Sequence, residues 1–157
     1  MEYCRLAGLP DLNQSNPFVR STLKTWIHDT IDTYKLDGIK VSSVVEVSKD
    51  FWTEYSHSAG VYSIGQVSDG NPNYVASYQG PLSALFNYPM NYKLISTFKE
   101  RQSMYEIRNG VEQNLVFPDA SILGNFLDNH DNPRFLSGNG DTTLLKNGLA
   151  YIMFAEV

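Results

Sequence analysis

The sequence predicts an α/β protein built on a parallel sheet, because strand-like and helix-like segments alternate along its 157 residues. Four short apolar segments are typical of strands, and the segments between them space their apolar residues as helices do. Parallel neighbouring strands need a crossover connection, and a helix is the usual one. The alternation fits a doubly wound sheet or part of a barrel, since a closed eight-stranded barrel takes roughly 250 residues.

The first predicted helix begins at Asn16-Pro17 and ends before Asp37-Gly38. Asn16 supplies a cap and Pro17 a first-turn proline, and the Asp-Gly pair stops the pattern. Six apolar side chains recur between them at helical spacing: Val19, Leu23, Trp26, Ile27, Ile31 and Tyr34. This spacing indicates an amphipathic helix.

The next three elements are predicted as a strand, a helix and a strand. Residues 38–44, GIKVSSV, have the β-branched composition of a strand. Ser48 is placed to cap a helix that ends at Ala59-Gly60. Residues 61–67, VYSIGQV, form the second predicted strand.

The remainder of the chain repeats this order. Five elements are predicted, namely strand 82–89, helix 90–102, helix 103–117, strand 121–131 and helix 141–156, the last capped by Asp141. No GxGxxG or GxxxxGK motif is present, so the sequence does not support a phosphate-binding loop.

The composition argues against nucleic acid and anionic membranes as partners. Seventeen acidic residues against twelve basic ones give a net charge of -5, and no run of Lys and Arg could follow a phosphate backbone. No stretch of about 18 apolar residues is present that could span a bilayer. The apolar content of 42% is enough to bury a core in one domain.

The N-terminal sequence MEYCRLAGLPDLN lacks the basic end, apolar middle and cleavage site of a secretory signal, so it leaves the compartment undecided. Cys4 is the only cysteine, which excludes an internal disulfide and a cysteine metal cluster. The triplet Asn13-Gln14-Ser15 matches a glycosylation acceptor, but such triplets often arise by chance.

Polar side chains follow three of the predicted strands, at Lys40–Ser43, Gln66–Asp69 and Asp128–Asp131. In parallel α/β folds, working groups gather at the carboxyl ends of the strands. The segment LDNHDNPRF places two carboxylates and an imidazole within four positions before a proline. It is a candidate site, with a simple Asx turn before the proline as the alternative.

Three segments, DGIKVSSVVEV, YSIGQVSDGNP and FLDNHDNPRF, resemble in this order the strand-end signatures of α-amylases of glycoside hydrolase family 13, particularly the fungal enzymes. The segments LPDLN, AGVY, YQGPL and LFNYPMNY are also similar to parts of those enzymes. The resemblance implies a partial (β/α)8 TIM barrel over residues 1–157, covering about strands 4 to 7 with their helices. The activity it implies is retaining hydrolysis of α-1,4-glucosidic bonds in starch or glycogen.

The resemblance also implies residue roles, and the two catalytic carboxylates of the family are substituted. Ser42 occupies the position of the nucleophilic aspartate, and Gln66 that of the acid/base glutamate. Lys40 replaces an arginine. Val45 and Glu46 stand where a lysine and a histidine lie near the sugar subsites. The positions of Lys40 and Glu46 are therefore predicted to bind substrate.

Four residues match the family as they stand. His130 and Asp131 correspond to the pair that holds the reacting sugar, with Asp131 at the position that stabilises the transition state. Asp69 and Gly70 match beside the second signature, and Asp69 would occupy a substrate subsite. These residues predict contact with α-glucan, either starch, glycogen or a maltooligosaccharide.

Inactivity follows from the two substitutions. A retaining glycosidase needs two carboxyl groups about 5 Å apart, whereas Ser42 is a neutral hydroxyl and Gln66 has no titratable proton. Gln66 keeps the shape of a glutamate without its chemistry. The alternative is weak hydrolysis or glucan transfer by a displaced carboxylate, for which Glu46, Asp69 and Asp128 are the candidates.

No cofactor or metal site is predicted. The structural calcium of the family is bound partly by the backbone carbonyl at the position of Glu46, but most of its other ligands lie in segments that this sequence does not include. The cysteine pair common in fungal members would align with Ala76 and Phe117, so both halves are missing together.

The resemblance further implies that barrel strands 1–3 and 8 are absent. Strands 4 and 7 would then be open edges that favour self-association. A third reading follows, in which the chain has a structural or partner-binding role and the missing strands come from another chain.

Overall fold

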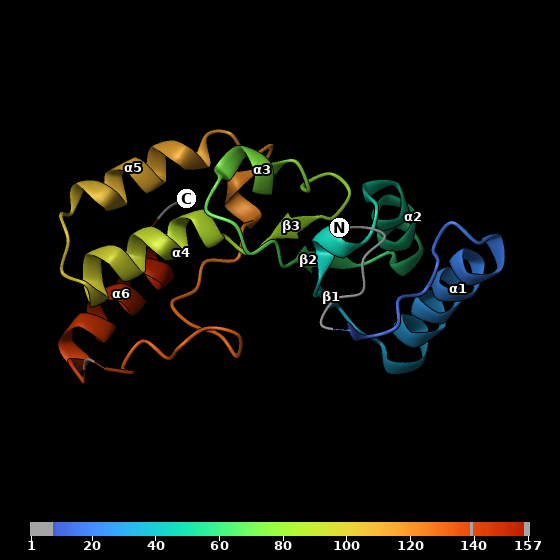
Figure 1. Cartoon of the computed structure of the whole chain (residues 1–157), viewed down its shortest axis with the longest axis horizontal. Coiled ribbons are helices and arrows are strands. Elements are labelled where there is room, and N and C mark those ends of the chain that lie inside the picture. The colour runs from blue at the N-terminus through green and yellow to red at the C-terminus, as the bar shows by residue number, and fades with distance from the viewer. Residues whose placement is uncertain (1–7, 139, 156–157) are drawn as a thin grey trace. The chain divides into compact units, whose positions relative to one another are not determined.

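The computed structural model describes residues 8–138 and 140–155 and divides them into two compact units (Figure 1). The first unit contains the residues up to Val67 together with Tyr78–Leu85. The second contains Ser68–Ser77 and the residues from Phe86 onward. None of the helices described is long and apolar enough to cross a membrane.

The first unit is a small parallel sheet with helices, as the sequence predicts. Its elements are α1 (Pro17–Tyr34), β1 (Gly38–Val41), the 3-10 helix η2 (Val44–Glu46), α2 (Lys49–Ala59), β2 (Tyr62–Gly65) and β3 (Ala84–Leu85). The strands lie in the order β1-β2-β3, and both pairs are parallel. Each strand is shorter than predicted, because the chain turns away from the sheet after Val41, Gly65 and Leu85.

The predicted caps of this unit are confirmed. The Asn16 side chain accepts a hydrogen bond from the Phe18 N–H, and the Ser48 hydroxyl accepts one from the Phe51 N–H. Gly60 ends α2 in the left-handed conformation with a φ of 66°. These local bonds satisfy helix-end donors that would otherwise lack partners.

A charge cluster joins the two helices of this unit. Glu54 of α2 accepts hydrogen bonds from the Arg20 guanidinium at 2.8 and 3.0 Å and from Lys24 Nζ at 2.7 Å, both on α1. The bond from Arg20, followed by that from Lys24, lowers the pKa of Glu54 from 4.5 to about 2. A carboxyl group whose pKa is lower in the folded state contributes stability above its unfolded pKa and loses it as the pH falls.

We therefore expect the urea concentration at the unfolding midpoint of the first unit to decrease as the pH is lowered from about 4.5 to 2. In Glu54→Gln this decrease should be smaller, because the variant has no carboxyl group at position 54 to protonate. Both tryptophans, Trp26 and Trp52, lie in this unit, so their fluorescence reports its unfolding. Glu112→Gln is a matched control, because it removes an exposed ion pair with Arg108 on a helix of the second unit. An identical pH dependence in Glu54→Gln and the wild type would contradict this account.

The second unit is helical. Its elements are α3 (Pro72–Ala76), α4 (Tyr88–Leu94), the π-helix η3 (Ile95–Lys99), α5 (Tyr105–Asn114), the 3-10 helix η4 (Ala120–Ile122) and α6 (Thr142–Phe154). Figure 1 shows α4 between α5 and α6. The core consists of Met90, Leu94, Leu127 and Phe135, with Leu144, Tyr151 and Ile152 of α6 packed against it. The predicted Asp141 cap is confirmed by bonds from the Thr143 and Leu144 N–H groups.

Two strand predictions for this part of the chain are wrong in whole or in part. Residues 121–131 do not form a strand, and within the described residues their only ladder contact is a single parallel bridge between Gly124 and Phe86. The side chain of Asn91 instead binds the carbonyls of Phe126 and Leu127, each at 2.9 Å, which replaces strand pairing. The third strand is also over-predicted, because residues 88–89 begin α4.

One edge of the sheet is open among the described residues. Val41 accepts a bond from the Gln66 N–H, so by the alternation of a strand the backbone groups of Lys40 face the other side. A groove of about 550 Å³ runs beside this edge, and its walls include Leu23, Trp26 and Ile27 of α1 and Phe51 of α2. The open edge expected for the first strand is present, while self-association stays a prediction. The open edge expected for the last strand has no counterpart, because residues 121–131 form no strand.

Candidate catalytic and sugar-contact site

The residues that the sequence singles out fall into two groups, one in each unit. Lys40, Ser42, Glu46 and Gln66 lie in the first unit. Asp69, Gly70, His130 and Asp131 lie in the second.

Lys40 and Ser42 are in direct contact at the carboxyl end of β1. Side chains two residues apart on a strand share a face, and here Lys40 Nζ donates to Ser42 Oγ at 2.6 Å. In the described part of the chain, no carboxylate or imidazole hydrogen-bonds to Ser42. The hydroxyl therefore accepts from a cation, and none of the described residues is hydrogen-bonded to it as a base that could remove its proton.

Gln66 is held at the end of the neighbouring strand. The register pairs Val41 with Gly65, and the Gln66 N–H donates to the Val41 carbonyl at 2.9 Å. This arrangement puts residues 42 and 66 at the same end of adjacent parallel strands.

Gly65, directly before Gln66, is fixed by close packing. A Cβ at this position would lie 2.3 Å from a methyl of Leu82 and 3.1 Å from one of Val44. Both side chains are fully buried, so they have little room to move. The glycine lets β2 pass beneath them and carry Gln66 to the sheet end.

Glu46 lies in η2 after a turn at Ser43, whose φ is 53°. It lines a pocket of about 220 Å³ together with Ser42 and Asp11. Glu46 and Ser42 therefore line the same pocket, although Glu46 lies four residues further along the chain. Asp11 is an acidic neighbour that the sequence analysis did not single out.

Few of the carboxylate ligands that a calcium ion takes are present in this pocket wall. Calcium takes about six to eight oxygen ligands, whereas Asp11 and Glu46 are the only carboxylates among the described residues of the pocket wall. More widely, residues 8–138 and 140–155 contain no group of three His, Cys, Asp or Glu side chains placed to hold a metal.

Asp69 and Gly70 form the loop that leads to α3. The Asp69 carboxylate accepts from the Asn71 N–H at 2.7 Å, so one of its oxygens is used by the loop itself. A Cβ on Gly70 would lie 3.2 Å from the ring of Tyr92, so this ring packs closely on the glycine backbone.

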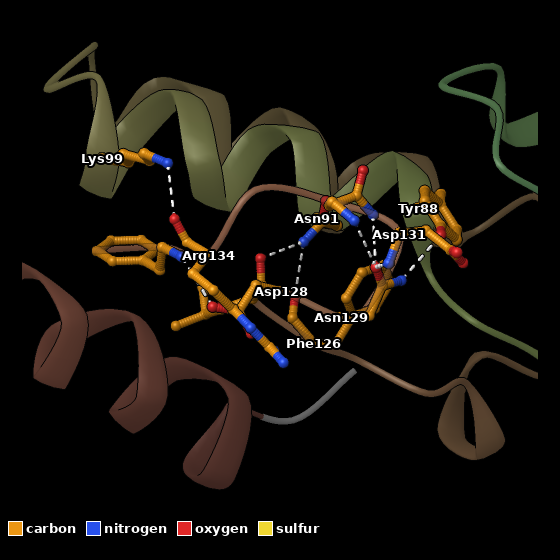
Figure 2. Close-up of polar contacts among 11 residues, drawn as sticks. Tyr88, Asn91, Lys99, Phe126, Asp128, Asn129, Asp131 and Arg134 are labelled. Carbon is orange, nitrogen blue, oxygen red and sulfur yellow. Dashed lines mark hydrogen bonds and ion pairs between the residues drawn. The ribbon is translucent and has the colours of Figure 1, made fainter. Parts of the chain in front are cut away.

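His130 and Asp131 stand together on an exposed turn. His130 Nε2 lies 3.4 Å from Asp131 Oδ1, and the two side chains are 69% and 47% exposed. Asn129, directly before them, accepts bonds from the Asp131 and Asn132 N–H groups (Figure 2). The pair is therefore carried by an ordered turn and is open to a ligand.

Asp128 closes this turn. Its carboxylate accepts from the Arg134 guanidinium and from the Phe135 N–H, both at 2.8 Å. Burial acts to raise the pKa of Asp128, but the Phe135 bond and the bond and charge of Arg134 outweigh it, so the pKa lies below its ordinary 3.8. Such a group stays ionised and has two structural partners, which suits it poorly to donate protons.

Several supporting residues could not be assigned from the sequence. Tyr88 and Asn91 of α4 bind the 126–129 segment through side chains some 35 to 41 positions away along the chain. The Lys40–Ser42 hydrogen bond could have been predicted from the sequence, because the alternation of an extended chain places residues two positions apart on one face.

Comparisons with known proteins confirm the predicted family. A family model described as the catalytic domain of alpha amylase matches residues 3–155. Alpha-amylase 1 of Lipomyces kononenkoae is 34% identical over 152 residues, covering 94% of this chain and 24% of the relative. Alpha-amylase 2 of Schwanniomyces occidentalis is 33% identical over 151 residues, covering 95% and 30%.

Solved structures give the same result. An α-amylase from Malbranchea cinnamomea superposes with a TM-score of 0.87 at 34% identity, covering 91% of this chain and 31% of that one. The α-amylase of Geobacillus thermoleovorans, complexed with acarbose, gives 0.92 at 27% identity, covering 99% and 38%. The chain spans about a quarter to a third of the length of the curated relatives. With the family model matched across nearly its whole length, the chain belongs to the α-amylase catalytic-domain family.

Proposed function

We propose that this chain is a partial α-amylase barrel segment that contacts α-glucan but does not hydrolyse it. The observation that carries the proposal is the pair of side chains at the two strand ends, Ser42 directly after β1 and Gln66 directly after β2. By resemblance, these positions hold the nucleophile and the acid/base in active relatives. Neither side chain is a carboxylic acid.

The geometry around Ser42 supports the loss of chemistry. A retaining enzyme needs an anion to attack the anomeric carbon and an acid to protonate the leaving oxygen. Ser42 Oγ accepts a hydrogen bond from the Lys40 ammonium, which neither removes its proton nor raises its nucleophilicity. An amide at position 66 cannot exchange a proton with the substrate.

Contact with glucan is supported by the His130–Asp131 pair, which by resemblance holds the reacting sugar. Both side chains are substantially exposed and polar, and the turn beneath them is ordered by Asn129 and Asp128. An imidazole and a carboxylate can together donate to and accept from sugar hydroxyls. The acarbose complex of the Geobacillus relative makes acarbose a suitable soluble probe.

Affinity electrophoresis through starch gels tests this contact. We expect the wild-type chain to be retarded, and the His130→Ala, Asp131→Ala double variant to run as it does in a gel without starch. Arg108→Ala, Glu112→Ala is the matched control, because it removes an exposed ion pair from α5 and should keep the retardation. Unchanged wild-type mobility would count against glucan contact and favour a structural or partner-binding role.

The second candidate function is weak hydrolysis or glucan transfer through a displaced carboxylate. One observation favours it, namely that Glu46 shares a pocket with Ser42. Asp69 and Asp128 are weaker candidates, because their carboxylates are engaged by Asn71 and by Arg134 and Phe135. Glu46→Gln is therefore the variant that separates this candidate from the main proposal.

A further inference from the structure

The turn that carries His130 and Asp131 has few regular backbone bonds, so its shape depends on side chains. Residues 127–135 contain no helix or strand. Backbone N–H groups in such a segment need partners outside a regular ladder. Asn129 supplies them, because its Oδ1 accepts from the Asp131 N–H at 2.9 Å, the Asn132 N–H at 3.0 Å and the Asn132 side-chain amide at 2.9 Å.

The same side chain ties the turn to a buried helix residue. Asn129 Nδ2 donates to the Tyr88 hydroxyl at 3.0 Å (Figure 2). Tyr88 is the first residue of α4, is 1% exposed, and packs edge to face against Phe126 and Tyr92. A phenol held by two rings is a rigid anchor for the exposed turn.

The two ends of the turn are fixed separately. Asn91 of α4 donates to the Phe126 and Leu127 carbonyls, which secures the chain before the turn. Asp128 binds Arg134 and the Phe135 N–H, and Lys99 donates to the Arg134 carbonyl, which secures the chain after it. The central part, where His130 and Asp131 lie, depends on Asn129.

We infer that Asn129 is the positioning residue for the His130–Asp131 pair, acting through its acceptor bonds to the turn and its anchor to Tyr88. This inference rests on the proposed glucan contact for its biological use, but not for its structural content. Asn129 does not contact the sugar in this account; it fixes the backbone from which Asp131 projects.

Amide hydrogen exchange read residue by residue, together with starch affinity, tests the inference. In Asn129→Ala, exchange at the Asp131 and Asn132 N–H groups should quicken roughly tenfold, since each loses its acceptor. Starch affinity should fall by a similar factor. Amides of α5 and α6, which Asn129 does not contact, should keep their wild-type rates.

Asn129→Asp is the conservative rescue. A carboxylate oxygen can still accept from the turn, and the Tyr88 hydroxyl can reverse its role and donate to the other oxygen. Exchange at Asp131 and Asn132 should therefore stay near the wild-type rate. Asn132→Ala is the matched control, because it removes one donor to Asn129 but leaves both backbone bonds in place.

Two results would overturn the inference. One is unchanged exchange at Asp131 and Asn132 in Asn129→Ala. The other is faster exchange throughout α4, α5 and α6, which would mean that Asn129 stabilises the whole unit rather than the turn. If the wild-type chain does not bind starch, the proposed glucan contact is wrong. The hydrogen-exchange rates at Asp131 and Asn132 still test the role of Asn129 in that case.

Discussion

The purified chain is expected to release no more product from a chromogenic maltooligosaccharide than its Gln66→Ala, Asp131→Ala double variant. A positioned acid/base contributes on the order of 10² to 10⁴ in rate, and position 66 holds an amide. By resemblance Ser42 stands at the nucleophile position, and a neutral hydroxyl there would also remove the covalent route. The two losses should not be multiplied, because catalytic residues that act as a unit are strongly non-additive.

The Glu46→Gln variant makes this assay decisive. Wild-type turnover that disappears in Glu46→Gln would show a displaced carboxylate at work in the pocket shared with Ser42, and the non-catalytic proposal would be wrong. Wild-type turnover that survives in Glu46→Gln would also contradict the proposal, but it would point to another carboxylate, such as Asp11, Asp69 or Asp128, as the working acid.

The largest effect on stability is expected for Asn87→Ala in the second unit. Asn87 is fully buried and caps α4 by accepting from the Met90 N–H. Its amide also donates to the side-chain oxygens of Asn114 and Asn125, at 3.1 and 3.0 Å. Losing the cap costs about 1 kcal/mol. The Asn114 oxygen is buried, and a buried acceptor left without a donor costs about 1–3 kcal/mol, whereas the Asn125 oxygen is only partly buried and can turn to water. We expect the free energy of unfolding of this unit to fall by about 2–4 kcal/mol.

Few other hydrogen-bonding groups near Asn87 could replace the bonds that the substitution removes. The Asn114 amide nitrogen and Gln113 Oε1 are already buried without a partner in the described part of the chain. Removing the Asn87 amide would leave the Asn114 side chain with no partner among the described residues.

Circular dichroism and tryptophan fluorescence can be followed together in urea to measure the effect. Asn16→Ala is the control, because Asn16 is an exposed cap on α1 and its loss should cost only about 1 kcal/mol. Both tryptophans lie in the first unit, so a shift seen in the helical signal alone would show that the two units unfold separately. A cost for Asn87→Ala no greater than that for Asn16→Ala would contradict the role given to the amide network.

Sequence reasoning succeeded where local chemistry decides the structure. The caps Asn16, Ser48 and Asp141 lie two or three residues from the N–H groups they bind, so their patterns are legible in the sequence. Short α3 was not predicted, although Asn71-Pro72 repeats the cap and proline of α1. Its five residues are too few to show a helical period.

The failed strand over 121–131 has a long-range cause. Its apolar residues are typical of a strand, but the carbonyls of Phe126 and Leu127 bind the Asn91 side chain. No local pattern reveals an amide 35 residues away that competes with a ladder. The site shows the same division, because the ends of β1 and β2 were found from the pattern, whereas the strand expected before Asp131 and the Tyr88–Asn129 anchor depend on distant side chains.

The close packing around Gly65 bears on how this chain can diverge. A larger residue there would have to displace the buried side chains of Leu82 and Val44, so it is disfavoured for steric reasons alone, whatever group stands at position 66. In a saturation library selected for folded protein, almost all variants recovered at position 65 should carry glycine. Position 66 should accept many substitutions. Persistence of that glycine in a lineage would thus reflect selection for folding, and would carry no information on catalytic activity.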